Sequence, residues 1–305
     1  MCTNTLPAQP APRDGYIAVG RAALYWREIG QGQPIIIVHG GPDFNHGYLL
    51  PDMDRLSDTF RLIYFDLRGR GKSAHNVQPE DVSIQSDVED LDKVRDHFRL
   101  DKAAVLGHSW GGVVAMEYAV RHPKRVSHLI LMNSAAASHA DYLLFRQELL
   151  RRTPADSEEK RLLSARDQYK AGDPQTVSEY YRVHFRATLR QPELLDRLIE
   201  SLRTSSSREG ILKAWAIEDR LMNQTQLASG YDLLPKLKQL RLPALVIHGE
   251  HDLVPLECSA HIAQAVPGAR LVVLKDCGHF PYIECPDALR QLLMDFFYRR
   301  YEGAA

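Results

Sequence analysis

The sequence of 305 residues is long enough for one large domain or two of ordinary size, with a sizeable buried core. Lys and Arg number 38 and Asp and Glu number 39, so the net charge of −1 argues against a protein that mainly binds nucleic acid or an anionic membrane. Hydrophobic residues make up 44% and charged residues 25%, which is typical of a globular chain and not of a disordered one. Composition alone names no function.

The compartment is predicted from what the chain lacks. No apolar run approaches the ~18–20 residues of a membrane span. The Pro-rich stretch 1–12 has no basic start and no apolar block, so we expect a frayed tail and not a signal peptide. Cys2, Cys258, Cys277 and Cys285 are too few for a disulfide scaffold and match no zinc spacing. We expect reduced thiols in a cytoplasmic protein, while a pairing of Cys277 with Cys285 stays open.

The first part of the chain alternates short β-rich segments with helical patterns. Strands are predicted at 16–19, 22–28, 35–38, 61–65, 103–106 and 126–132. Helices are predicted at 84–98, where Val88, Leu91 and Val94 recur at three-residue steps, and at 111–121. This rhythm implies a mostly parallel sheet with helices on both faces.

The rhythm stops between residues 134 and 235, where the chain is charged and no strand is convincing. Helices are predicted there at 142–152, 157–171, 177–188, 192–201 and 209–221. Strands then return at 243–248 and 270–274, with helices at 256–266 and 286–298. We predict an α/β core in two pieces, 1–133 and 236–305, with a helical insertion at 134–235 and eight strands in all.

The segment after the fifth predicted strand carries a nucleophile motif. Sites in parallel α/β sheets lie outside the C-terminal ends of the strands. Gly107-His108-Ser109-Trp110-Gly111 is G-x-S-x-G between a strand and a helix, the context that the motif requires. The tight turn exposes the serine hydroxyl, and the helix N-terminus supplies N–H groups for a developing oxyanion. Ser109 is therefore predicted as the nucleophile.

The last two predicted strands are followed by a carboxylate and a histidine. Asp252 comes after strand 243–248 and His279 after strand 270–274. A serine nucleophile needs a base, and the base needs a group that orients it. The chain order Ser109, Asp252, His279 is that of the α/β-hydrolase fold. His279 is predicted as the base and Asp252 as its orienter.

Other assignments of these loops stay open. Glu250 or Asp276 could replace Asp252 as the orienter, and His279 could be a surface histidine. His248, His251 and Asp252 could be taken for a metal cluster, but no matching ligand set lies elsewhere in the sequence. We therefore predict no metal and no cofactor.

Two glycine-containing loops follow the third and fourth predicted strands. After the third comes His39-Gly40-Gly41-Pro42, where this fold places an oxyanion donor, so the backbone N–H groups of Gly41 and Trp110 are predicted to form the oxyanion hole. His39 is expected to brace its own loop. The loop 66–73 ends in Gly-Lys-Ser, but Asp66 stands where a phosphate-binding loop needs glycine, so a structural role is predicted.

These residues resemble the α/β-hydrolase superfamily, and within it the prolyl iminopeptidases and their amidase relatives. The resemblance rests on 39–42, on 66–73, on 107–112 with Trp110 after the serine, and on the loops of Asp252 and His279. The helical insertion corresponds in position to the cap of that family. The resemblance implies a cofactor-free serine hydrolase that removes an N-terminal residue, preferably proline, from short peptides.

The resemblance also implies that acidic residues of the cap hold the free amine. The stretch 214–219 looks like the aromatic-plus-Glu segment that carries one such acid, which makes Glu218 the candidate. Alternatively, Glu218 and Asp219 form a solvated helix face beside Arg220. The family pattern usually reads His-Gly-Gly-Pro-Gly, and here the fifth residue is Asp43. Asp43 either attracts an amine itself or marks a different substrate.

Several functions therefore remain as hypotheses. The first is an iminopeptidase-like aminopeptidase or amidase acting through an acyl-enzyme on a small molecule or short peptide. An ester or lactone hydrolase on the same triad is the nearest alternative, and a carbon–carbon bond hydrolase is a third. A non-catalytic ligand receptor on the same scaffold belongs to a different class. We expect no nucleic-acid or membrane partner, and the sequence does not predict the oligomeric state.

Overall fold

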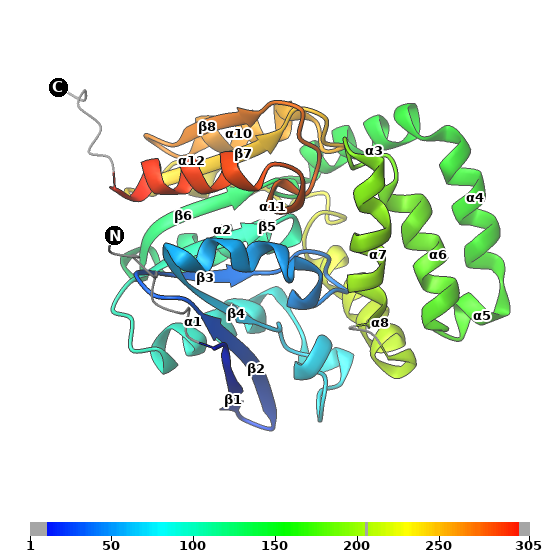
Figure 1. Ribbon diagram of the computed structural model, residues 1–305, viewed down its shortest axis with the longest axis horizontal. Coiled ribbons are helices and arrows are strands. Elements are labelled where there is room, and N and C mark those ends of the chain that lie inside the picture. The colour runs from blue at the N-terminus through cyan, green and yellow to red at the C-terminus, as the bar shows by residue number, and fades with distance from the viewer. Residues whose placement is uncertain (1–10, 205–206, 299–305) are drawn as a thin grey trace, which may run out of the picture.

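The computed structural model describes residues 11–204 and 207–298, so Cys2 and the predicted tail up to residue 10 lie outside the described residues. Eight strands form one sheet in the order β1-β2-β4-β3-β5-β6-β7-β8 (Figure 1). The pairs β1–β2 and β2–β4 are antiparallel, and every pair from β4–β3 to β7–β8 is parallel. The strands are β1 (Arg13–Val19), β2 (Ala22–Ile29), β3 (Gln33–Val38), β4 (Phe60–Phe65), β5 (Ala103–His108), β6 (Val126–Met132), β7 (Ala244–Gly249) and β8 (Arg270–Leu274). The predicted mostly parallel, eight-stranded sheet is confirmed.

Helices cover both faces of the sheet because successive residues of its central strands point to opposite sides. In β3, Ile36 and Val38 pack in a core with α1 (Ile84–His97), α2 (Trp110–Arg121) and α10 (Leu256–Ala265). Ile35 and Ile37 face the other side, where α12 (Pro286–Tyr298) and the 3₁₀ segment Asp52–Asp58 pack. The uninterrupted apolar run of β3 thus reflects burial on both faces.

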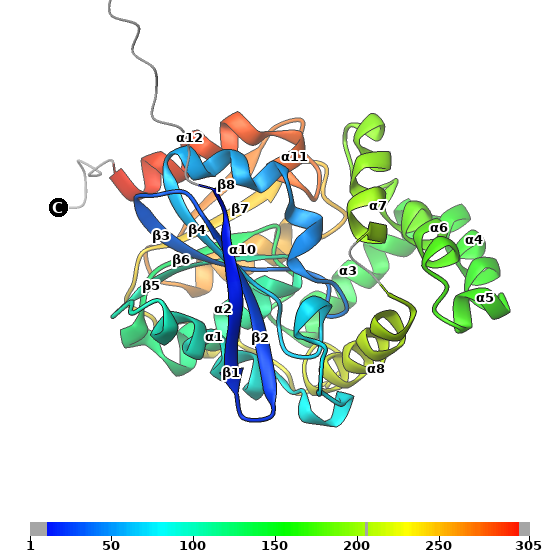
Figure 2. The same ribbon diagram turned by 60° about the horizontal axis from the view of Figure 1, so that its bottom comes forward.

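The chain between β6 and β7 is helical, as predicted, and lies beyond the C-terminal ends of the parallel strands (Figures 1 and 2). We call its six main helices, α3 to α8, the cap. They are α3 (His139–Arg152), α4 (Pro154–Ala165), α5 (Asp167–Lys170), α6 (Pro174–Phe185), α7 (Leu195–Thr204) and α8 (Arg208–Gln224). The short α9 (Leu234–Leu237) leads back to the sheet, and α11 (Pro281–Glu284) follows β8.

Two predicted helices of the cap differ from the structure. The segment predicted as one helix at 157–171 is two, because Arg166 adopts an extended ψ of 142° between α4 and α5. The helix predicted at 192–201 begins with a 3₁₀ turn at Pro192–Leu194, and its α-helical part starts only at Leu195. No Gly or Pro marks the break at Arg166, whereas the 3₁₀ turn begins at Pro192.

The loop 66–73 has the structural role that was predicted. The carboxylate of Asp66 accepts hydrogen bonds from the backbone N–H groups of His46, at 3.0 Å, and Lys72, at 2.8 Å. Arg68 pairs with Asp90 of α1, and Arg70 pairs with Asp87 of the same helix in a fully buried ion pair. These contacts fix the loop after β4 beside the loop after β3.

Two further observations concern the cysteines and the helices of the described residues. Cys258, Cys277 and Cys285 are free thiols, and burial raises the pKa of Cys258 to about 12. None of the helices that the structure describes is both long and apolar enough to cross a bilayer.

Candidate active site

Ser109 lies at the turn between β5 and α2, on the edge of the sheet that the cap covers. Its φ of 53° and ψ of −119° are strained for a non-glycine residue, as expected of a nucleophile held in a sharp strand-to-helix turn. The turn is possible because neighbours come very close: a Cβ on Gly107 would lie 2.3 Å from the Gly111 carbonyl oxygen, and one on Gly111 would lie 2.1 Å from that of Val38. Ser109 lines a cavity of about 460 Å³ between core and cap.

His279 and Asp252 meet at the same edge. Nδ1 of His279 lies 2.9 Å from both carboxylate oxygens of Asp252, and His279 lines the cavity together with Ser109. Burial opposes ionisation of Asp252, but the neighbouring imidazole and a side-chain amide outweigh it and lower the pKa of the carboxyl to about 2. The carboxylate therefore stays charged at neutral pH and fixes the Nδ1–H tautomer of His279, which leaves Nε2 as the basic nitrogen.

Asn133 is a residue of this constellation that sequence reasoning missed. Its side-chain N–H groups donate to Asp252 Oδ2 at 2.7 Å and to the Gly278 carbonyl oxygen at 3.0 Å. Asn133 directly follows β6 and has a φ of 46°. Like Ser109 after β5, Asn133 comes directly after a parallel strand. A search of the residues at every strand end would therefore have found it. Asn133 holds the carboxylate and the histidine loop in one geometry.

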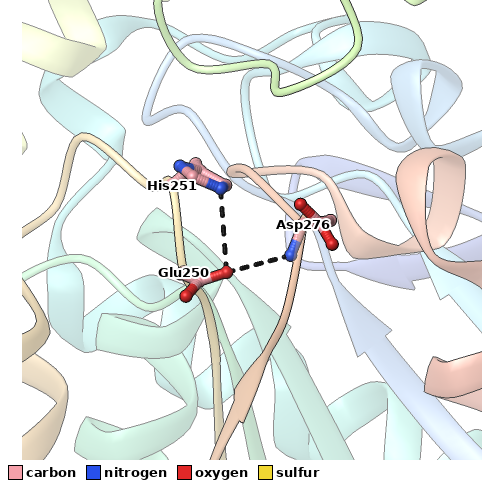
Figure 3. Close-up of side chains that lie close together, drawn as sticks. All are labelled: Glu250, His251 and Asp276. Atoms are coloured by element: carbon pink, nitrogen blue, oxygen red, sulfur yellow. Dashed lines mark hydrogen bonds and ion pairs between the residues drawn. The ribbon is translucent and has the colours of Figure 1, made fainter.

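Glu250 and Asp276, the alternative orienters, lie close to each other and to His251 (Figure 3). Glu250 Oε2 accepts a hydrogen bond from the Asp276 backbone N–H at 3.1 Å and lies 3.7 Å from His251 Nε2. Glu250 and Asp276 are exposed and His251 is half-buried, with ligand atoms within 4.8 Å of one another. Among the described residues, no buried side chain without a hydrogen-bond partner belongs to this surface cluster, so nothing there points to an ion. His248 instead bonds Ser259 at 3.0 Å, so His248, His251 and Asp252 do not converge.

The two predicted oxyanion donors, the backbone N–H groups of Gly41 and Trp110, belong to residues that line the cavity beside Ser109. Trp110 is the first residue of α2, so its N–H has no acceptor within the helix. His39 braces its loop as predicted: its Nε2 accepts from the Leu67 N–H at 3.1 Å, and its Nδ1 lies 3.0 Å from the Gly40 carbonyl oxygen. Burial lowers the pKa of His39 to about 4, so the ring is neutral.

A buried chain of hydrogen bonds, also missed from the sequence, joins the loops of Gly40, His108 and His279. The Gly40 N–H donates to the Tyr48 hydroxyl at 2.7 Å, and that hydroxyl lies 2.6 Å from His108 Nδ1. His108 Nε2 lies 2.9 Å from the His279 carbonyl oxygen. Burial lowers the pKa of His108 to about 3, so the neutral ring donates from Nε2 and accepts from Tyr48 at Nδ1. The chain links the oxyanion loop to the nucleophile turn and to the histidine loop.

The structure brings both predicted substrate-binding acids into the cavity of Ser109. Asp43 follows the Gly41 loop, and Glu218 projects from α8 of the cap. Burial raises the pKa of Asp43 to about 6, partly opposed by a hydrogen bond from the Tyr181 hydroxyl. Burial and the nearby charge of Asp43 raise the pKa of Glu218 well above its usual range. Glu218 is half-buried and faces Asp43, whereas Asp219 and Arg220 are exposed, so Glu218 does not belong to a solvated helix face.

Aromatic side chains surround the two acids. Tyr169 stacks on Trp215 with ring centroids 4.7 Å apart and packs against Tyr180 at 5.0 Å. Phe44 packs against Tyr181 at 5.1 Å. A pair of carboxyl groups at an aromatic wall suits a small cationic group whose ring or chain is apolar.

The sequence matches the model of a known protein family. Residues 33–286 match the family model described as the alpha/beta hydrolase fold. The chain is 28% identical over 288 residues to a proline iminopeptidase of Clostridioides difficile, with 89% of this chain and 93% of the relative covered.

Solved structures of enzymes with different activities have the same fold. A proline iminopeptidase from Mycobacterium smegmatis is similar with a TM-score of 0.70 and 21% identity, covering 93% of this chain and 97% of that one. An enol-lactonase from Burkholderia xenovorans LB400 gives a TM-score of 0.67 and 23% identity, covering 93% and 100%. The fold therefore does not choose between peptide and ester substrates. By sequence and architecture, the chain belongs to the α/β-hydrolase family and resembles its proline iminopeptidases along most of its length.

Proposed function

We propose that this hydrolase is an aminopeptidase of the proline iminopeptidase type that works through an acyl-enzyme. The observation that carries the proposal is the sharing of one cavity by Ser109, the His279–Asp252 pair and the two acids Asp43 and Glu218. The acids supply what an ester hydrolase does not need, a binding site for the free amine of an N-terminal residue. The aromatic wall beside them suits the apolar ring of proline.

Each residue has a defined part in the proposed reaction. His279 Nε2 takes the proton of the Ser109 hydroxyl as its oxygen attacks the acyl carbon, and the N–H groups of Gly41 and Trp110 bind the oxyanion. The C–N bond then breaks, and His279 gives the proton to the departing amine. Water, deprotonated by the same imidazole, hydrolyses the acyl-enzyme and restores Ser109. Asp252 remains ionised throughout and stabilises the imidazolium.

Three chromogenic substrates test the proposal. We expect the purified protein to release 4-nitroaniline from proline 4-nitroanilide with a higher kcat/KM than it shows for the same anilide of N-acetylproline, because acetylation removes the charged amine. p-Nitrophenyl acetate serves as the ester comparison. Turnover of the ester alone would contradict the peptidase assignment and favour an ester or lactone hydrolase on the same triad.

The affinity for an amine should rise as the pH rises through about 6. Asp43 has its pKa raised to about 6, so below this pH both it and Glu218 are protonated and no negative charge faces an ammonium group. Above it, Asp43 ionises. Competitive inhibition by prolinol, which has the amine but no bond to cleave, should strengthen about tenfold between roughly pH 5 and 7. N-acetylprolinol is the control, and an equal pH effect on both compounds would refute an ionising amine site.

A further inference from the structure

Two positively charged side chains line the same cavity as the two acids. Arg146 of α3 and Lys160 of α4 line it together with Asp43 and Glu218. The proposed reaction gives the acids a role and leaves the cations without one. A cavity with separate negative and positive sides fits a ligand that carries an amine and an acid at different ends.

Helix α6 shows where the two sides lie relative to the reacting groups. Tyr181 bonds the acid Asp43, and His184, three residues further along the helix, has its Nδ1 3.5 Å from Lys160 Nζ. Residues three apart share one face of a helix. Just beyond the helix, the Thr188 carbonyl oxygen accepts from the His279 N–H at 2.8 Å. The residues that contact Asp43, Lys160 and His279 therefore follow one another in this order along the chain.

The contact of Lys160 at His184 is four residues from that of His279 at Thr188, so Lys160 lies toward the histidine that protonates the departing group. His279 protonates the leaving amine in the proposed mechanism, so the part of the substrate beyond the cleaved bond lies toward His279. Lys160 and His279 both lie near His184, whose pKa burial lowers to about 3, so that its ring is neutral. Lys160 thus lies near the leaving-group side, while Asp43 and Glu218 hold the opposite end.

Within the part of the chain that the structure describes, neither Lys160 nor Arg146 forms an ion pair. Other cap arginines do: Arg151 pairs with Glu148, Arg161 with Glu158, and Arg186 with Asp156. Asp156 is the acid whose charge acts on Lys160, and it is already bonded to Arg186. Burial and the charge of Arg146 lower the pKa of Lys160, which an incoming anion would relieve.

We propose that Lys160, assisted by Arg146, binds the terminal carboxylate of the substrate, so that dipeptides and similarly short free-acid peptides are preferred. This inference rests on the proposed aminopeptidase function. The two contacts on α6 are about one helical turn apart, roughly 5 Å, and an extended peptide spans ~3.3–3.6 Å per residue, so the roughly 7 Å of a dipeptide is long enough to reach both sides.

The wild-type enzyme provides the first test without any substitution. We expect kcat/KM for proline release from prolyl-alanine to exceed that from prolyl-alaninamide by about tenfold, because the amide lacks the charge that Lys160 binds. Equal rates, or a preference for the amide, would overturn the inference and leave the aminopeptidase function standing. If neither peptide nor proline 4-nitroanilide is cleaved while an ester is, the proposed function itself fails.

Variants of Lys160 then test whether this side chain causes the preference for the free acid over the amide. Lys160→Met should bring the acid-to-amide ratio of kcat/KM to about one, and Lys160→Arg should restore most of it. Lys170→Met, an exposed lysine on α5 that does not line the cavity, is the matched control and should keep the wild-type ratio. A full preference retained in Lys160→Met would overturn the assignment, and circular dichroism checks that each variant is folded.

Discussion

Replacing Ser109 with alanine should lower kcat for every substrate by about 10⁴-fold or more, to a level at which turnover is hard to detect. Enzymes that use a Ser-His-Asp constellation lose this much when the nucleophile is removed, because the histidine and aspartate act only through it. The strained φ of 53° at this position is imposed by the contacts of Gly107 and Gly111 with their neighbours, which the substitution leaves in place. The variant should therefore fold like the wild type.

The measurement is kcat with proline 4-nitroanilide, together with the midpoint of thermal unfolding. Ser127→Ala is a suitable control, because Ser127 lies near the start of β6 and so at the opposite edge of the sheet from the active site. Labelling by a fluorophosphonate separates a catalyst from a receptor. The wild type should be labelled at Ser109 and the variant should not. Unchanged activity in Ser109→Ala would refute the mechanism, and an unlabelled wild type would favour a ligand receptor.

Much of the core was predictable because its signals are local. The strands β6 and β8 and the helix α12 have the predicted bounds, since each is a short apolar or periodic run between clear breaks. The strand-end rule then located Ser109, Asp252 and His279, because parallel strands deliver their C-terminal loops to one edge. The structure supports this placement directly through the Asp252–His279 contact.

What could not be predicted depends on packing between distant segments. The hydrogen bonds that run from Gly40 through Tyr48 and His108 to His279 include one between residues 171 positions apart. No periodicity in the sequence predicts such a contact. The same holds for Lys160 beside His184, which depends on how α4 lies against α6. The break between α4 and α5 at Arg166 is likewise not marked by a helix-breaking residue.

Removing the ionisable group of either acid should reduce the preference for an amine-bearing substrate, because a bound ammonium group favours the ionised carboxylate. We expect Glu218→Gln and Asp43→Asn each to lower the ratio of kcat/KM for proline 4-nitroanilide over p-nitrophenyl acetate by about 30- to 150-fold. A charge-assisted hydrogen bond in a partly enclosed site contributes about 2–3 kcal/mol, which corresponds to that factor. The ester carries no amine, so its rate in each variant corrects for general damage to the site.

The same substitutions separate a binding role from a structural one. Burial disfavours the ionised form of Glu218, as its raised pKa shows, so an uncharged isosteric glutamine should leave the unfolding midpoint equal or slightly higher. If Glu218 served mainly to stabilise the fold, Glu218→Gln would instead lower the unfolding midpoint. Glu209→Gln, in the exposed first turn of the same helix, is the control and should change neither quantity. If Glu218→Gln and Asp43→Asn both keep the wild-type ratio, the amine site is wrong, and the cavity then favours an ester or lactone substrate on an otherwise unchanged triad.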